Sequence, residues 1–133
     1  MNIEKIKQTI LYLFAIGLSL SVLFFIVLGV WIGHETRSLC DDAQGEYAGD
    51  CVEALIALLE DESRGYKARN RAVWSLGQFG DGRALPALQK YHTGEIPDRE
   101  PLDETLSQYE LKKAINLVEG GTNIAAFIWR QSL

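Results

Sequence analysis

The feature that most constrains this chain is a run of 25 residues, from Thr9 to Gly33, without one charged side chain. About 20 apolar residues cross a hydrocarbon core of roughly 30 Å, and a helix over this run reaches roughly 37 Å at about 1.5 Å per residue. Tyr12 and Trp31 lie near opposite ends, where aromatic rings favour the headgroup level. A buried core helix is the alternative, but the rest of the chain is too small to enclose so apolar a cylinder. The run predicts a tilted transmembrane helix over residues 9–33.

A cleavable signal peptide is the main competing interpretation, because Lys5 and Lys7 form a basic stretch before the run. The apolar region of a signal peptide is only about 7 to 15 residues long, and no A-x-A cleavage site follows this one. The residues before Cys40 also do not fit a lipobox. An uncleaved anchor is the preferred interpretation, and a secreted binding module released by cleavage remains the alternative.

The flanking charges predict the orientation of the helix. Lys5 and Lys7 precede the run, whereas Arg37 is the one basic residue that closely follows it, so residues 1–8 are expected in the cytoplasm. The chain has 13 Lys and Arg and 18 Asp and Glu; with Lys5, Lys7 and Glu4 before the run, 11 basic and 17 acidic residues follow it, a net charge of −6. Residues 34–133 are therefore expected on the periplasmic or extracellular side, and their charge argues against nucleic acid as a partner.

Cys40 and Cys51 are predicted to form a disulfide, which an oxidising compartment permits. On one continuous helix their Cα atoms would be about 16 Å apart, well beyond the limit of about 7 Å for a bridge. Residues 34–50 are therefore predicted to be a juxtamembrane stalk with a turn, broken by Gly45 and Gly49. Two unrelated buried thiols are the alternative. The acidic residues around the turn lack the spacing of a calcium loop.

Beyond Asp50 the apolar spacing is helical. One helix is predicted over CVEALIALLEDES, a second over YKARNRAVWSLGQFG that ends at Gly80, and a third through ALPALQKYH with Asp81 as its N-cap. The hexapeptide ALIALL at 54–59 matches ALPALQ at 84–89 with an offset of 30 residues, which indicates an internal repeat.

The segment ARNRAVWSLGQFGDGRALPAL, from Ala68 to Leu88, closely resembles the short HEAT-like repeat of phycobilin lyase subunits and many bacterial scaffold proteins. The resemblance implies an all-α fold, with two antiparallel helices per repeat and the turn at Gly80 and Asp81. It also implies a shared core that contains Leu76, Phe79, Ala84, Leu85 and Leu88. We therefore expect one N-terminal transmembrane helix followed by a HEAT-like α-α hairpin module at 51–133.

The last part of the module is predicted to close the stack as a degenerate second hairpin. After a polar loop, Ser107 and Glu110 have the spacing of a capping box, and Leu106 and Leu111 that of a hydrophobic staple. A helix is expected from Gln108 to the glycine pair at 120–121. A final helix, capped by Thr122 or Asn123, would carry Ile124, Phe127 and Ile128 on its apolar face.

No sequence motif for catalysis, phosphate binding or metal binding occurs, so we expect no enzyme activity, no cofactor, no metal and no small-molecule substrate. His34 is interpreted as an interfacial residue and His92 as a helix-terminal one. Arg64, Lys67 and Arg71 share a helix face, which we interpret as a solvated face paired with local acids.

Two features point to a protein partner. Trp74 lies off the buried stripe of its helix, so it is either an exposed anchor or packed beneath the loop at 92–104. The membrane helix carries small residues four apart, a pattern that lets helices approach closely in lipid; the predicted contact residues are Gly17, Ser21, Gly29 and Gly33.

These features favour a membrane-anchored HEAT-like interaction module, acting as a scaffold or accessory subunit of a membrane protein complex or as a homo-oligomer. Repeat folds usually need about three units, and this chain holds two imperfect ones, so a partner could cover the open end. Bilin-lyase-like assistance to chromophore attachment is the alternative function. The predicted anchor and outward topology would separate such a lyase from cytosolic substrates.

The predicted topology is tested by protease protection on sealed cells. Residues after Gly33, including the loop around Pro97, should be cleaved in intact cells because the module lies outside. Protection of this loop in intact cells, with cleavage only after lysis, would invert the topology and remove the oxidising compartment that the disulfide needs.

Overall fold

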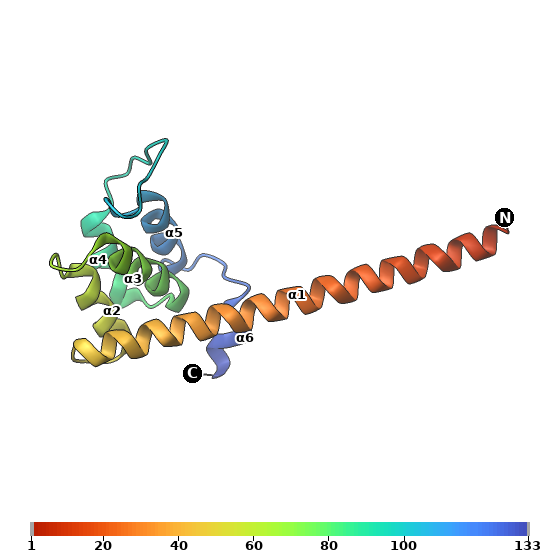
Figure 1. Cartoon of the computed structure of the whole chain (residues 1–133), viewed down its shortest axis with the longest axis horizontal. Helices are drawn as coiled ribbons and strands as arrows, with labels where there is room; N and C mark the ends of the chain where they lie inside the picture. Colours follow the sequence, from red (N-terminus) through yellow and green to blue (C-terminus); the bar gives the residue numbers. More distant parts are fainter. Residues whose placement is uncertain (1, 133) are drawn as a thin grey trace.

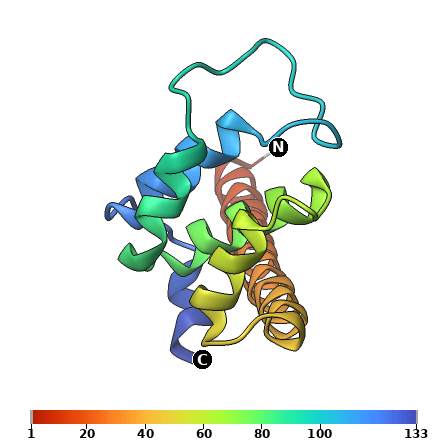
Figure 2. The ribbon, with the colours of Figure 1, turned by 90° about the vertical axis from the view of Figure 1, so that its left-hand side faces the viewer.

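The computed structural model describes residues 2–132 as six α-helices and two short 3-10 helices, with no β-strand in that range. Figure 1 shows one long helix, α1, projecting far beyond a bundle formed by the other elements. Figure 2, viewed along this helix, shows the bundle gathered at its end, with an open loop between α4 and α5. The predicted all-α fold is confirmed.

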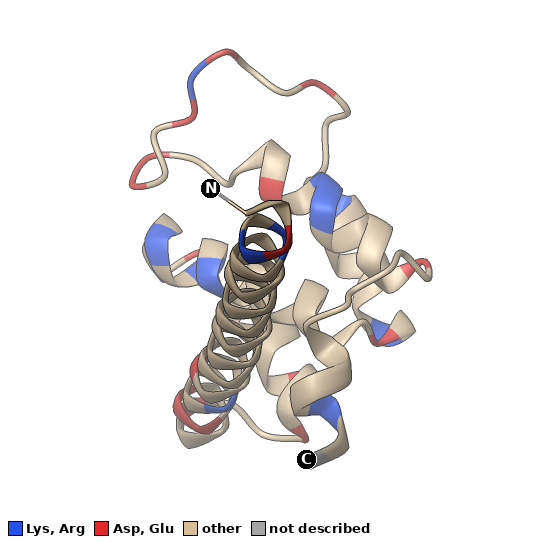
Figure 3. Ribbon diagram, turned by 90° about the vertical axis from the view of Figure 1, so that its right-hand side faces the viewer, with Lys and Arg blue, Asp and Glu red and all other residues tan. Residues whose placement is uncertain are grey.

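Helix α1 (Ile3–Glu46) has 44 residues, which corresponds to about 66 Å. The side chain of Asn2 caps it by accepting from the Glu4 N–H at 3.3 Å. Its most apolar window has 6% of its residues buried, and Figure 3 shows its charges confined to the two ends. The helix is long and apolar enough to span a membrane, a property that a transmembrane anchor shares with a signal sequence.

The break within residues 34–50 is shorter than predicted, because α1 continues without interruption to Glu46. Gly45 lies inside the helix, and the turn is made by residues 47–50, where Gly49 adopts φ 109°. An interior glycine costs a helix up to about 1 kcal/mol. Burial of Leu39 and Ala43 against the module offsets this cost, since each is at most 4% exposed.

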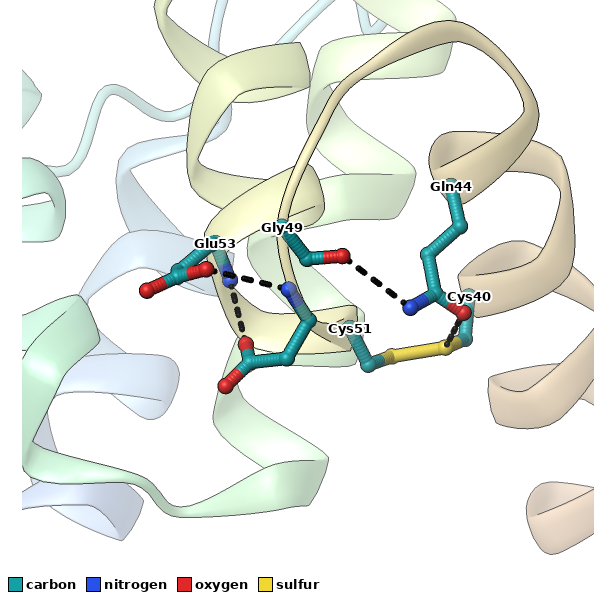
Figure 4. The surroundings of a disulfide bond; sticks show 6 residues. Cys40, Gln44, Gly49, Cys51 and Glu53 are labelled. Carbon is teal, nitrogen blue, oxygen red and sulfur yellow. Dashed lines mark hydrogen bonds between the residues drawn. A yellow bond between two sulfur atoms is a disulfide. The ribbon is translucent and has the colours of Figure 1, made fainter.

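The turn brings Cys40 of α1 and Cys51, the first residue of α2 (Cys51–Glu60), together with their Cα atoms 5.2 Å apart and their sulfur atoms at disulfide distance. Figure 4 shows the pair beside the turn, where the Gln44 side-chain amide donates to the Gly49 carbonyl at 3.2 Å. The structure thus brings together the two cysteines that the sequence paired.

The HEAT-like hairpin consists of α3 (Tyr66–Phe79) and α4 (Leu85–Tyr91), joined by the 3-10 helix η1 (Gly82–Ala84). Gly80 ends α3 in the left-handed conformation, as predicted, and Pro86 lies in the first turn of α4. By the 30-residue offset, α2 corresponds to α4. The last turns of α1 therefore stand where the first helix of the preceding hairpin would be.

Arg83 links the two equivalent turns. Asp50 caps α2 in a capping box with Glu53, and Asp81 caps η1 by accepting from the Arg83 N–H. The Arg83 guanidinium contacts both carboxylates, at 2.7 Å and 2.9 Å. The pKa of Asp50 is lowered by the backbone N–H of Glu53 and by Arg83, and the pKa of Asp81 mainly by Arg83. Because both pKa values fall on folding, these contacts stabilise the fold at neutral pH and are lost as the pH drops through them.

Helix α5 (Gln108–Val118) begins at the predicted residue and packs closely on α3. The absence of a side chain at Gly77 permits this approach, since a Cβ there would lie 2.9 Å from the Ala114 Cα. The predicted capping box is only half formed. Ser107 Oγ accepts from the Glu110 N–H at 3.1 Å, but the Ser107 N–H donates to Asn70 Oδ1 at 2.8 Å instead of to Glu110.

Helix α6 (Ala126–Trp129) and η2 (Arg130–Ser132) do not form the predicted second hairpin on α5; α6 lies against α1 instead (Figure 1). The predicted cap at Thr122 or Asn123 is wrong, because α6 begins later and its N-cap residue is Ala125; Asn123 Oδ1 still accepts from the Ala126 N–H at 3.2 Å. Ala126 and Trp129 are buried, and the ring of Trp129 meets Phe79 edge-to-face at 5.7 Å. Ile124 and Phe127, predicted to be apolar contacts, are exposed.

Closing the loop between Cys40 and Cys51 should stabilise the chain by about 3 kcal/mol in the chain-entropy model. We expect intact-mass analysis of non-reduced protein to find no free thiol, and Cys51→Ser to lower the free energy of unfolding in urea by that amount. Wild-type protein in reductant is the matched control and should lose the same stability. Two free thiols in freshly isolated protein would contradict the prediction.

Candidate functional site

A groove of about 400 Å³ lies between α1, α3 and the loop that precedes α5. It is open to solvent on one side and mostly apolar inside. The residues that line it are Trp31, Glu35, Leu39, Lys67, Asn70, Arg71, Trp74, Leu102 and Glu110. Its volume lies in the range of sites that receive small molecules or a few side chains of a partner protein.

Two helical stripes form the walls of this groove. On α1, residues Trp31, Glu35 and Leu39 are four apart, so they lie one above another on the same face. On α3, the spacing from Lys67 through Arg71 to Trp74 has the same effect. Leu39 is buried, whereas Trp31 is 59% exposed. The groove thus runs from the core of the module to the end of the uncharged run.

An ion pair bridges the two walls. Arg71 Nη2 lies 2.6 Å from Glu35 Oε1, and farther along α1, Arg64 Nη1 lies 2.6 Å from Glu46 Oε2. Two residues of the predicted basic face are therefore paired with acids, as expected. The acids belong to α1 and not to neighbouring turns of α3, so the pairs join the module to the long helix.

Asn70 holds the loop that forms the rim. Its side chain is 9% exposed, and its amide donates to the carbonyls of Leu102 at 3.1 Å and Thr105 at 2.9 Å. Its Oδ1 accepts from the buried Ser107 N–H, and Glu100 accepts from the Ser107 hydroxyl at 2.7 Å. These bonds place Leu102 beside the groove. Sequence reasoning missed Asn70; the available signal was a polar residue three positions before Val73 on the buried side of a helix.

Trp74 combines the two alternatives given for it. It is half-buried, and it lines the groove together with Leu102, which belongs to the loop expected to cover it. The side chain is therefore partly covered, while the groove remains open beside it.

The four predicted small residues of α1 are divided into two pairs. A Cβ added at Gly17 would meet nothing within 4 Å, and Ser21 Oγ donates to the Gly17 carbonyl at 2.9 Å. Gly29 and Gly33 are buried under α6, in contact with Ile128 and Trp129. The expectation that all four form one partner-binding face is wrong for this second pair, because the same chain already covers it.

Within residues 2–132, no group of three or more His, Cys, Asp or Glu side chains is arranged to hold a metal ion. His92 is the C-cap residue of α4, in agreement with its predicted helix-terminal position. Two acids at the turn and the start of α2, Asp50 and Glu53, form the capping box of α2 and ion pairs with Arg83.

The family model for the PBS lyase HEAT-like repeat matches residues 68–91, which cover most of α3, all of η1 and all of α4. No curated protein and no solved structure matches the chain. The chain therefore carries a HEAT-like repeat at the hairpin where the sequence indicated one. This hairpin packs between α2 and α5.

Replacing Asn70 tests how the rim is held. Asn70→Ala removes three hydrogen bonds and leaves the buried Ser107 N–H without its acceptor, so the free energy of unfolding should fall by about 1–3 kcal/mol. We expect faster tryptic cleavage after Arg99 in the loop, measured by mass spectrometry at a temperature where the module stays folded.

Asn70→Asp is the matched control for this experiment, because it keeps an oxygen acceptor for Ser107 while it loses both donated bonds. Its cleavage rate should fall between those of the wild type and Asn70→Ala. Equal cleavage of all three proteins would show that Asn70 does not hold the loop.

Proposed function

We propose that this HEAT-like chain is a membrane-anchored protein-interaction module, which acts as a scaffold or accessory subunit of a membrane protein complex. In this proposal α1 crosses the bilayer with its N-terminus in the cytoplasm, and the module lies outside. The observation that carries the proposal is the apolar groove beside the end of the uncharged run, lined by Trp31 and Trp74.

The two tryptophans suit a partner that is itself in the membrane. Trp31 belongs to the last turns of the uncharged run and Trp74 to the HEAT-like helix, yet both line one groove. Tryptophan in a partly enclosed pocket is typical of residues that carry most of the binding energy of an interface. The ion pair between Glu35 and Arg71 adds a charged edge that can orient the partner.

The contacts between α1 and the module support a helix that is not cleaved as a signal peptide. Leu39 and Ala43 belong to the module side of α1, and Trp129 is buried against Gly33. Removal of the uncharged run would uncover Ile128 and Trp129, which a soluble product would then expose to water. These contacts favour an anchor over a secreted module.

Bilin-lyase-like activity remains the second candidate, because the repeat that matches takes its description from that family. The match covers one hairpin, and the repeat by itself is an architecture on which different functions are built. A chromophore that co-purifies with the chain and absorbs visible light would favour this candidate over a scaffold.

A lateral contact in the membrane is proposed through Gly17 and Ser21. A Cβ at Gly17 would meet no other atom, whereas one at Gly29 would meet Ile128 at 2.6 Å. Contact through the helix and contact through the groove reinforce each other, since tethering at one site raises the effective concentration at the other.

Trp74→Ala should weaken recovery of the partner by about 30-fold, the equivalent of about 2 kcal/mol for an aromatic hot spot. The measurement is quantitative mass spectrometry of proteins that co-purify with the full chain in mild detergent. Tyr109→Ala is the matched control, because Tyr109 is an exposed aromatic residue of α5 that does not line the groove. Gly17→Leu, combined with the same readout, tests the contact within the membrane.

Two outcomes would contradict the proposal. One is a wild-type chain that purifies alone and as a monomer under the same conditions. The other is a set of co-purifying proteins that Trp74→Ala, Gly17→Leu and Tyr109→Ala leave equally unchanged.

A further inference from the structure

The segment from Gly120 to Trp129 is unusually apolar for a surface segment. It contains no ionisable residue, and two of its large side chains face solvent, Ile124 at 66% and Phe127 at 74% exposure. Isolated apolar side chains are common on the surface of soluble proteins, so their exposure alone identifies no contact. The position of these side chains relative to α1 indicates what surrounds them.

The packing of α6 on α1 sets the depth of this segment. Ile128 contacts α1 at Gly29 and Trp129 contacts it at Gly33. Gly33 is the last residue of the uncharged run, and Gly29 lies four residues earlier, about 6 Å farther into the run. The contacts of α6 with α1 therefore lie within about the last 6 Å of that run. Interfacial helices are buried by about 5–10 Å into the boundary between headgroups and acyl chains.

From this position we infer that Ile124 and Phe127 insert into the interfacial region of the same bilayer that α1 crosses. The inference rests on the proposed span and goes beyond it, because it assigns a second membrane contact to the module. At this level α1 itself exposes Val30 and Trp31, at 58% and 59%. Phe127 directly precedes Ile128, which contacts Gly29, so lipid that surrounds α1 at this level reaches Phe127.

The charges near the segment are compatible with this contact. Arg130 follows the apolar residues directly, but its Nε donates to the Gln78 carbonyl at 2.9 Å, so its guanidinium is held at the end of α3. The module carries an excess of acid, so the attraction is apolar and does not require anionic lipid. A neutral phosphatidylcholine bilayer should be sufficient.

Lipid is favoured over a second copy of this chain for a geometric reason. A protein that covered Phe127 would have to lie in the bilayer interface at the level of Gly29, on a side of α1 about 200° away from Trp31 and the groove that the proposed partner fills. The short length of α6 and the two exposed side chains provide a small surface, below what a stable protein interface buries.

The test is photo-cross-linking of the full chain in phosphatidylcholine vesicles. Phe127→p-benzoylphenylalanine keeps an aromatic ring at an exposed position and should form a covalent adduct with lipid on irradiation, detected by mass spectrometry. The same probe in place of Phe24, in the middle of the uncharged run, is the positive control. The probe in place of Tyr109 on α5 is the negative control. We expect the adduct yield at Phe127 to approach that at Phe24 and to exceed that at Tyr109 many times.

The two controls separate the inference from the proposal on which it rests. Lipid adducts at Phe24 without adducts at Phe127, or adducts between two protein chains at Phe127, would overturn the inference and leave the span intact. Absence of lipid adducts at both positions would overturn the span itself. Equal yields at Phe127 and Tyr109 would show unspecific contact and also overturn the inference.

Discussion

One unbroken helix, α1, combines an exposed apolar part with a part buried in the module, and the rest of the structure depends on it. The first part of α1 exposes apolar side chains along an uncharged run, and its last turns bury Leu39 and Ala43 in the core of the module. The module attaches to this helix by the Cys40–Cys51 pair, by the ion pairs of Arg64 and Arg71, and by α6. Because α1 is continuous, the orientation of the module is tied to that of the exposed apolar part of the helix.

The same helix resolves the problem of a repeat fold with too few repeats. A HEAT-like hairpin buries its two faces only against neighbouring units. Here the end of α1 and α2 form the unit before α3 and α4, and α5 covers the other side. Arg83 joins the turns of the two units through Asp50 and Asp81. The long helix is thus both the proposed membrane segment and the first helix of the stack.

Helix ends that depend on neighbouring residues could be predicted from the sequence. Gly80 ends α3 by adopting the left-handed conformation, and the Ser107 side chain caps the first turn of α5. Both effects act on adjacent backbone groups, so these two helix ends were correctly predicted. Gly45 was wrongly predicted to break the helix, because the burial of Ala43 outweighs the weak helix propensity of this glycine. The capping box was half wrong, because its backbone donor binds Asn70, which lies 37 positions away in the sequence. No pattern confined to neighbouring residues could indicate that competition.

The groove was predictable in its parts and not as a whole. Trp31 was identified as an interfacial residue and Trp74 as a candidate anchor, each from its place in its own helix. That they line one groove depends on the turn after α1 and on the packing of α3 against that helix, which are long-range contacts. Gly29 and Gly33 were likewise identified as contact residues, but not the segment that covers them. Small residues permit close helix approach both in lipid and within one chain, so the pattern does not distinguish a partner helix from α6.

The continuity of α1 also fixes the rotational relation between the proposed membrane segment and the groove. Gly17 and Glu35 are 18 positions apart in one helix, which is about five full turns, so they point in the same direction. A neighbouring helix that packs on Gly17 therefore lies on the side of α1 that carries the groove. One residue inserted between them would rotate the two sites apart by about 100°, without altering a single contact within the core of the module.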